Sequence, residues 1–155
     1  MKYFLLVAIV HLLSGCTKEE MTLYKAYLKN TTSHKIEVKP YFGGVVSSDK
    51  IITLLANETK EIANGFDRGI VGNAGFNSQN LSGSDSLIII FDNLYSITHY
   101  LNNPTSLAQK HYLYSSNRNL YNKDNYNYSY QDVSKHKRES TYMYNFIEQD
   151  YLDAR

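Results

Sequence analysis

Residues 86–91 of the chain are SLIIIF, the most apolar segment outside the first sixteen residues. Apolar side chains occupy both sets of alternate positions, which predicts a central β-strand that is covered on both faces. Asp92-Asn93 follows, and because both residue types tolerate a left-handed backbone, the pair predicts a tight hairpin. Residues 94–100 (LYSITHY) would form the return strand.

Alternation of apolar and polar residues predicts further strands on both sides of this hairpin. The alternating strands are residues 22–30, 35–42, 125–130 and 140–147, and residues 51–55 and 59–63 are expected to be strands on either side of a turn at Asn57-Glu58. Pro40 cannot donate to a strand ladder, so its strand is expected to end there or to lie at an edge. Residues 148–154 (EQDYLDA) predict a short closing helix, since acidic residues in a first turn suit the helix dipole.

Three other stretches are less regular. Residues 64–84 are rich in Gly, Asn and Ser but contain apolar residues, which predicts an omega-type loop that packs back on the domain. These apolar residues are Phe66, Ile70, Val71, Phe76 and Leu81. Residues 106–110 predict a weak helical turn, and residues 135–138 (KHKR) predict a basic turn.

Seven to nine short strands with little helix predict a mostly-β fold. We expect a single antiparallel β-sandwich, immunoglobulin-like or related, with a short C-terminal helix. The length of 155 residues suits one domain, which we expect to span residues 22–155. A hydrophobic content of 43% with 20% charged residues is typical of a globular chain.

Composition also excludes several classes of protein. The formal net charge of +1 leaves no broad positive field for a nucleic-acid backbone. The single cysteine excludes an intrachain disulfide framework and a cysteine-based zinc cage. The composition is biased instead toward tyrosine, with 15 residues and no tryptophan.

The N-terminus has the organisation of a signal peptide. Lys2 provides a basic start, and residues 4–13 (FLLVAIVHLL) form an apolar run. This run is too short to span a bilayer, which takes about 20 apolar residues, but it has the length of a signal-peptide core. It ends in Leu13-Ser14-Gly15-Cys16.

This tetrapeptide resembles the lipobox of bacterial lipoproteins. The resemblance implies that Leu13, Ser14 and Gly15 are recognised by the signal peptidase, that cleavage precedes Cys16, and that Cys16 carries the lipid. Residues 1–15 would then be the signal peptide and residues 16–21 the acylated cysteine and its tether. The alternative is a buried N-terminal strand with a chance cysteine, which would need no small-residue box.

Lipidation has physical consequences. Cleavage removes one basic residue of 16 and no acidic residue, which leaves 15 basic and 15 acidic side chains. The lipid, rather than charge, would therefore hold the protein to the membrane, and two or more acyl chains make such anchoring stable.

The residues after the cysteine indicate where the anchored protein would lie. Thr17 is not the acidic residue that retains enteric lipoproteins at the inner membrane, and Lys18-Glu19-Glu20 resembles the surface-export signal of Bacteroidota lipoproteins. These charges could equally form a solvated tether. We expect an outer-membrane location with exposure at the cell surface. The alternating aromatic strand near the C-terminus, together with the lipobox, is similar to small uncharacterised lipoproteins of Bacteroidota, which implies no activity.

The sequence contains no recognisable catalytic constellation. The histidines after Cys16 form no zinc-binding pair, no nucleophile elbow is present, and the acidic residues are scattered. His99 is expected to be a hydrogen-bonded histidine within the sheet. Residues 119–129 are rich in oxygen donors but lack the EF-hand register, so a solvated loop is favoured over a calcium site. We therefore predict no catalytic residue, no metal and no cofactor.

The tyrosines are the one feature that suggests recognition, because an aromatic face can stack on a sugar ring. If exposed, four of them could form such a platform: Tyr112, Tyr114, Tyr121 and Tyr126. The period-two pattern favours core-facing positions for Tyr126, Tyr128, Tyr130, Tyr142 and Tyr144. Asp85-Ser86-Leu87 also resembles an O-glycosylation sequon of Bacteroidota, which would place a glycan on Ser86.

These observations predict a lipid-anchored, non-enzymatic module of the cell envelope, with a structural or interaction role. The alternative is a surface glycan-binding accessory lipoprotein that uses exposed tyrosines. The expected partners are the membrane, through the lipid anchor, and an envelope protein or a polysaccharide. Nucleic acid is not expected to bind.

Overall fold

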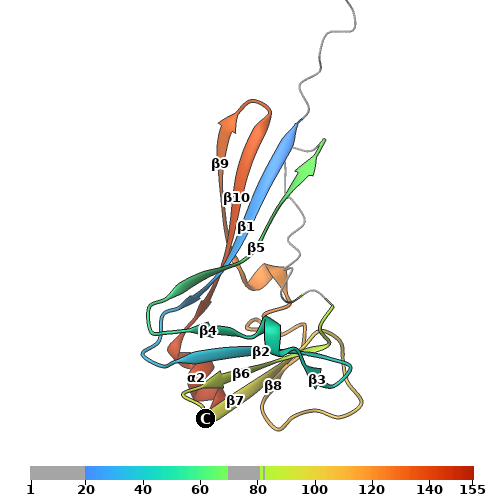
Figure 1. The fold of residues 1–155 in the computed structure, drawn as a ribbon, viewed down its shortest axis with the longest axis vertical. Helices are drawn as coiled ribbons and strands as arrows, with labels where there is room; N and C mark the ends of the chain where they lie inside the picture. Colours follow the sequence, from blue (N-terminus) through green and yellow to red (C-terminus); the bar gives the residue numbers. More distant parts are fainter. Residues whose placement is uncertain (1–19, 70–80, 82) are drawn as a thin grey trace, which may run out of the picture.

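The computed structural model describes residues 20–69, 81 and 83–155. They form a β-sandwich of two packed sheets with one short C-terminal helix, α2 (Glu148–Ala154), which confirms the predicted fold class (Figure 1). The four-stranded sheet contains β1 (Met21–Asn30), β5 (Thr59–Arg68), β9 (Asn127–Ser134) and β10 (Lys137–Phe146). The six-stranded sheet contains β2 (Ile36–Phe42), β3 (Val45–Val46), β4 (Ile52–Leu54), β6 (Ser86–Phe91), β7 (Tyr95–Tyr100) and β8 (His111–Tyr112). Two short 3-10 helices are η1 (Ser48–Lys50) and η2 (Lys123–Asn125).

The four-stranded sheet joins the two ends of the domain. Its order is β5-β1-β10-β9, and β1 runs parallel to β10, with Met21 opposite Lys137 and Asn30 opposite Phe146. The pair β7–β8 is also parallel, so the expectation of antiparallel neighbours throughout is wrong. An immunoglobulin sandwich places its first two strands side by side. Here β1 lies between β5 and β10, so the strand order is not that of an immunoglobulin domain.

The six-stranded sheet has β6 at its centre, in the order β3-β2-β6-β7-β8 with β4 beside β2. This confirms the central position predicted from its sequence, but full cover on both faces is wrong. Leu87, Ile89 and Phe91 are buried, whereas Ile88 and Ile90 are only partly so. The reason is that the four-stranded sheet packs against one face alone.

Backbone chemistry explains two local features. Asp92 and Asn93 have φ values of 50° and 59°, which confirms the predicted tight turn between β6 and β7. Pro40 lies inside β2, opposite Leu87 of β6, and the strand continues past it to Phe42. On the other side of β2 neither β4 nor β3 pairs with Pro40, so its missing N–H breaks no ladder.

The core lies between the two sheets, and α2 packs against it. Its largest fully buried apolar side chains come from both sheets and from the loop before β9: Leu28, Ile36, Leu54, Leu87, Ile89, Phe91, Leu120, Tyr144 and Phe146. Each such side chain contributes about 1.5–3 kcal/mol when it is removed from water. Period-two burial in β1, β6 and β10 is therefore the main stabilising pattern of the fold.

The irregular stretches differ from expectation. Residues 106–110 contain no helical turn. β5 continues to Arg68, into the predicted loop, and leaves Phe66 exposed, whereas Leu81 is buried as an inward-packing loop residue should be. Ile70, Val71 and Phe76 lie outside the described residues.

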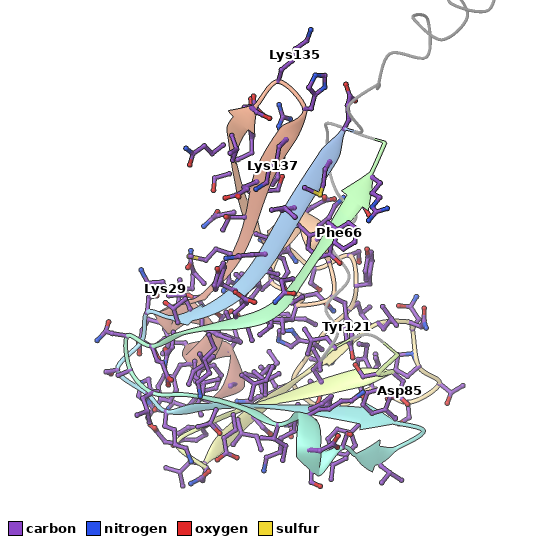
Figure 2. The ribbon with its side chains drawn as sticks, turned by 45° about the horizontal axis from the view of Figure 1, so that its top comes forward. Lys29, Phe66, Asp85, Tyr121, Lys135 and Lys137 are labelled. Carbon is purple, nitrogen blue, oxygen red and sulfur yellow. The ribbon has the colours of Figure 1, made fainter. Side chains whose placement is uncertain are left out.

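One end of the four-stranded sheet extends beyond the six-stranded sheet, as Figure 1 shows. β1 begins there, β5 ends there, and the β9–β10 turn lies at the tip, where Lys135 and Lys137 are labelled in Figure 2. The Met21 N–H donates to the His136 carbonyl over 2.8 Å, which holds the start of β1 against this turn. All eight residues of β9 are exposed, and we refer to this strand, residues 127–134, as the exposed edge.

Candidate functional site

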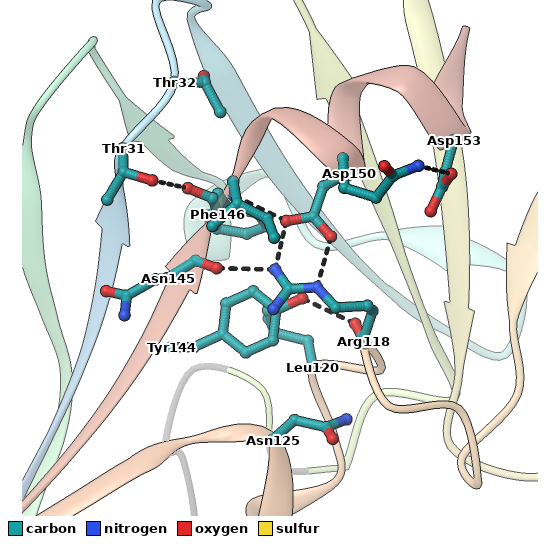
Figure 3. A network of polar contacts seen from close by, with 12 residues as sticks. Thr31, Thr32, Arg118, Leu120, Asn125, Tyr144, Asn145, Phe146, Asp150 and Asp153 are labelled. Carbon is teal, nitrogen blue, oxygen red and sulfur yellow. Dashed lines mark hydrogen bonds and ion pairs between the residues drawn. The ribbon is translucent and has the colours of Figure 1, made fainter.

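The most concentrated polar network lies where the loop before β9 meets α2 (Figure 3). The Arg118 guanidinium binds both carboxylate oxygens of Asp150, with Nε 2.8 Å from Oδ1. It also donates to the Asn145 carbonyl over 2.7 Å. The same carboxylate accepts the Ile147 N–H over 2.9 Å, so Asp150 caps the helix that carries it.

Tyr144 completes this network from β10. The Arg118 guanidinium lies 4.8 Å from the centre of the Tyr144 ring, and the Tyr144 hydroxyl donates to the Arg118 carbonyl over 2.7 Å. Burial acts to lower the pKa of the Arg118 guanidinium, but the hydrogen bonds to Asp150, together with electrostatic interactions with Tyr144, Asp150 and Tyr112, raise it overall. Because both charges are fully engaged, the network holds the loop, β10 and α2 together.

His99 is buried beside this network. Its Nδ1 accepts the Leu120 N–H over 3.0 Å, and its ring packs edge-on against Tyr112 at 5.1 Å between centroids. Burial, helped by the charge of Arg118, lowers the pKa of His99 to about 3. The imidazole is therefore neutral, and the prediction of a hydrogen-bonded sheet histidine is confirmed.

Asparagines organise the loop between β8 and β9. The fully buried Asn119 donates to the Tyr100 and Tyr112 carbonyls, both over 2.9 Å, and accepts the Tyr121 N–H. Asn125 donates to the carbonyls of residues 116 and 119. The oxygen-rich segment 119–129 thus uses its amides to shape a loop. Among the described residues, no group of three or more His, Cys, Asp or Glu side chains is placed to hold a metal ion.

Three of the four tyrosines proposed to stack on sugars are built into the body. The Tyr112 hydroxyl donates to the Asp153 carboxylate, Tyr121 shares a 2.6 Å hydrogen bond with Ser84, and Tyr126, 6% exposed, donates to the Leu120 carbonyl. Burial raises the pKa of all three phenols. Tyr126 is buried in the core, and the rings of Tyr112 and Tyr121 are partly buried and pack against it, so these three residues do not form an open aromatic platform. Tyr114, in contrast, is 45% exposed.

The tyrosines expected to face the core also divide into two groups. Tyr126, Tyr142 and Tyr144 are buried, which confirms the prediction for them. Tyr128 and Tyr130 are 39% and 56% exposed, so the prediction is wrong for both. These two residues belong to the exposed edge, which the six-stranded sheet does not cover.

An aromatic row along the exposed edge is the candidate functional site. The Tyr128 ring lies 5.9 Å from that of Tyr130 and 5.1 Å from that of Tyr142. The Arg138 guanidinium lies 4.0 Å from the centre of the Tyr130 ring and pairs with Asp132 at 2.7 Å. Alternation in NYNYSY predicted that these tyrosines share one face of a strand, but it placed that face in the core.

A surface pocket of about 300 Å³ opens beside the row. It is lined by Lys123, Asp124, Tyr126, Tyr128 and Tyr142. Two of these tyrosines are buried and one is exposed, so the pocket has a fixed aromatic floor and an accessible aromatic wall. We refer to it as the tyrosine pocket.

A second cluster, which sequence reasoning missed, surrounds His34. Its Nδ1 lies 2.6 Å from the Asp92 carboxylate, and its ring stacks on Tyr151 at 3.7 Å and 11°. Its Nε2 lies 3.5 Å from Glu148. The hydrogen bond from His34 lowers the pKa of Asp92. These contacts join the β1–β2 loop and the β6–β7 turn to α2.

Of the residues that the sequence predicts to be recognised by the signal peptidase or modified, only Ser86 lies in the described part of the chain. Ser86 opens β6, is half-buried, and donates to the Asp85 carboxylate over 2.9 Å. Leu13, Ser14, Gly15 and Cys16 lie outside the described residues. Among the described residues, no helix is both long and apolar enough to cross a bilayer.

Comparison with known proteins yields no relative. No family model matches the chain, no curated protein matches it, and no solved structure matches its fold.

Proposed function

We propose that this chain is a lipid-anchored protein of the bacterial outer membrane, a non-enzymatic module that supports or binds other envelope components. The observation that carries the proposal is the sequence Leu13-Ser14-Gly15-Cys16 directly after a ten-residue apolar run. The charges of Lys18-Glu19-Glu20 support exposure at the cell surface.

The position of β1 is compatible with such an anchor. Met21, five residues after Cys16, begins β1 at the tip of the projecting end. Five residues span at most about 17 Å when fully extended. A lipid on Cys16 would therefore hold this tip near the membrane and direct the six-stranded sheet away from it.

A binding or structural role is supported by how the buried ionisable groups are used. Arg118 and Asp150 neutralise each other, and His99 is held neutral by burial. These groups stabilise loops, and none of them faces the tyrosine pocket as a lining residue.

Anchoring is tested by growing cells with a radiolabelled fatty acid and comparing the wild type with Cys16→Ser. The wild type should incorporate label and sediment with the membranes, and Cys16→Ser should incorporate none. Ser14→Ala, which keeps a small residue in the box, is the matched control and should retain label. An unlabelled wild type, or a labelled Cys16→Ser variant, would overturn the proposal.

The second candidate function, glycan binding, is favoured by one specific observation: Tyr128 is accessible beside a preformed pocket. It predicts that the chain is retarded in native gels that contain a suitable polysaccharide. A panel of gels holding an α-glucan, a β-glucan, a mannan and a xylan tests it, and unchanged mobility in all of them would count against it.

A further inference from the structure

The tyrosine pocket has the construction of a ligand site with a rigid base. Tyr126 and Tyr142 are 6% and 3% exposed, and Tyr126 packs edge-on against Tyr144 at 5.5 Å. The hydroxyl of Tyr126 donates to the Leu120 carbonyl, and that of Tyr128 shares a 3.2 Å hydrogen bond with Ser140. The rings are therefore fixed before any ligand arrives, which lowers the entropic cost of binding.

The rim of the pocket is polar and electrically balanced. Lys123 and Asp124 lie in η2, whose backbone is held by Asn122 as its cap. Neither charged side chain has a hydrogen-bond or ion-pair partner among the residues that the structure describes. One ammonium and one carboxylate thus provide free donors and acceptors with no net charge.

This combination selects a particular ligand chemistry. Neighbouring hydroxyl groups both donate and accept hydrogen bonds, so they match an ammonium beside a carboxylate. The less polar face of a sugar ring stacks on an aromatic ring. A phosphate or another anion would meet the Asp124 carboxylate, and a purely apolar ligand would bury both charges without partners. The volume of about 300 Å³ is at the lower end for small-molecule sites, which suits one sugar ring.

We propose that the tyrosine pocket binds one ring of a neutral glycan, with Tyr128 as the stacking surface and Lys123 and Asp124 as hydrogen-bonding groups. Tyr130 extends the aromatic row along the exposed edge, 5.9 Å from Tyr128, so the rest of an oligosaccharide lies along β9. The inference rests on the second proposed function, for which it specifies the site and the ligand class. It is independent of the lipid anchor.

The test uses the purified full chain in detergent and native gels that contain a neutral α-glucan, β-glucan, mannan or xylan. Polygalacturonate gels provide the anionic control. Wild type should be retarded by at least one neutral polysaccharide and not by polygalacturonate. Tyr128→Ala should weaken binding about tenfold, as expected for loss of one aromatic contact, whereas Tyr128→Phe should retain it. Asp124→Asn should weaken binding less than Tyr128→Ala does.

Tyr114→Ala is the matched control, because Tyr114 is also exposed but does not line the pocket. It should bind like the wild type, and an unchanged melting temperature of Tyr128→Ala should show that the variant is folded. Retardation that survives Tyr128→Ala would overturn this site while leaving glycan binding in place. Retardation by polygalacturonate alone would overturn the neutral ligand. No retardation in any gel would overturn both the site and the second proposed function.

Discussion

β10 and β9 are neighbours in one sheet and have similar tyrosine-rich sequences, but they hold their tyrosines differently. β10 buries Tyr142 and Tyr144 between the sheets, whereas β9 exposes Tyr128 and Tyr130. The difference comes from position: β10 is a central strand that faces the six-stranded sheet, and β9 is an edge that extends past it. A period-two pattern identifies a strand, but the opposing layer decides which of its faces is buried.

The two regions also use charge differently. In the body, the Arg118–Asp150 pair is largely buried and linked to the backbone, with Asp150 only 3% exposed. At the exposed edge, the Arg138–Asp132 pair lies on the surface, with Asp132 53% exposed. A buried pair is costly to break because one charge is left without a partner, whereas an exposed pair contributes little. The buried pair therefore stabilises the body, whereas the ion pair of the exposed edge contributes little to the stability of the fold.

The largest expected effect comes from removing one tyrosine from each region. Tyr144→Ala should lower the free energy of unfolding by about 4 kcal/mol, because it opens a cavity in the core and removes the ring that packs on Arg118. Tyr130→Ala should change stability by less than about 0.5 kcal/mol, because its ring is largely exposed. Urea unfolding of both variants measures the contrast, and equal losses would show that the exposed edge is part of the core.

The ion pairs provide the next contrast. Asp150→Ala should destabilise the chain by about 3 kcal/mol, since it strands the Arg118 charge and removes the cap of α2. Asp132→Ala, its surface counterpart, should leave the melting temperature within experimental error. A large loss of stability in Asp132→Ala would contradict the conclusion that the exposed Arg138–Asp132 pair contributes little.

Acid should destabilise the body through His99. Its pKa in the folded chain is about 3, well below the ordinary value of 6.5, so the unfolded chain takes up a proton first as pH falls. Stability is fully present above pH 6.5 and should fall by up to about 1.4 kcal/mol per pH unit between pH 6 and pH 3.

The window from pH 6.5 to pH 5 is the one in which to measure this effect, because most carboxylates remain ionised there, and a His99 variant separates His99 from the other histidines. His99→Gln, which keeps a hydrogen-bond acceptor for Leu120, should be less stable at neutral pH but show a shallower slope. An unchanged slope in this variant would show that another group is responsible.

The smallest expected effect concerns the junction of β1 with β5. Gly65 lies opposite Tyr24, and a Cβ at Gly65 would lie 2.4 Å from the Tyr24 hydroxyl oxygen and 2.5 Å from the ring. Gly65→Ala should therefore cost about 1 kcal/mol by displacing the ring. The double variant Gly65→Ala with Tyr24→Ala should recover part of that loss in a double-mutant cycle. Additive losses would show that the two side chains do not contact each other.

Much of the fold could be predicted from local patterns. Apolar runs and alternation located every strand longer than two residues in the described part of the chain, and Asp92-Asn93 identified its hairpin, because backbone sterics and the strand period act within a few residues. The parallel pairing of β1 with β10 could not be predicted, since it joins segments more than a hundred residues apart. The two-residue strands β3 and β8 are too short to show any period.

The sequence predicted the type of candidate site, a surface of tyrosines, but not the residues that form it. Tyrosine richness suggested a stacking surface, but Tyr126 is a core residue and Tyr112 and Tyr121 are partly buried against the core. Hydrogen bonds of Asn119 and Arg118 hold the loop between β8 and β9 in this arrangement. Tyr128 was expected in the core because its alternation matches that of Tyr142. No local signal reveals which of two paired strands lies at the edge of the sheet.

Attachment through Cys16 is tested most directly by intact-mass spectrometry of the chain purified from membranes. The predicted mass is that of residues 16–155 with a diacylglycerol group and an amide-linked acyl chain. A mass equal to that of the unmodified chain beginning at Met1 would contradict the proposed anchor.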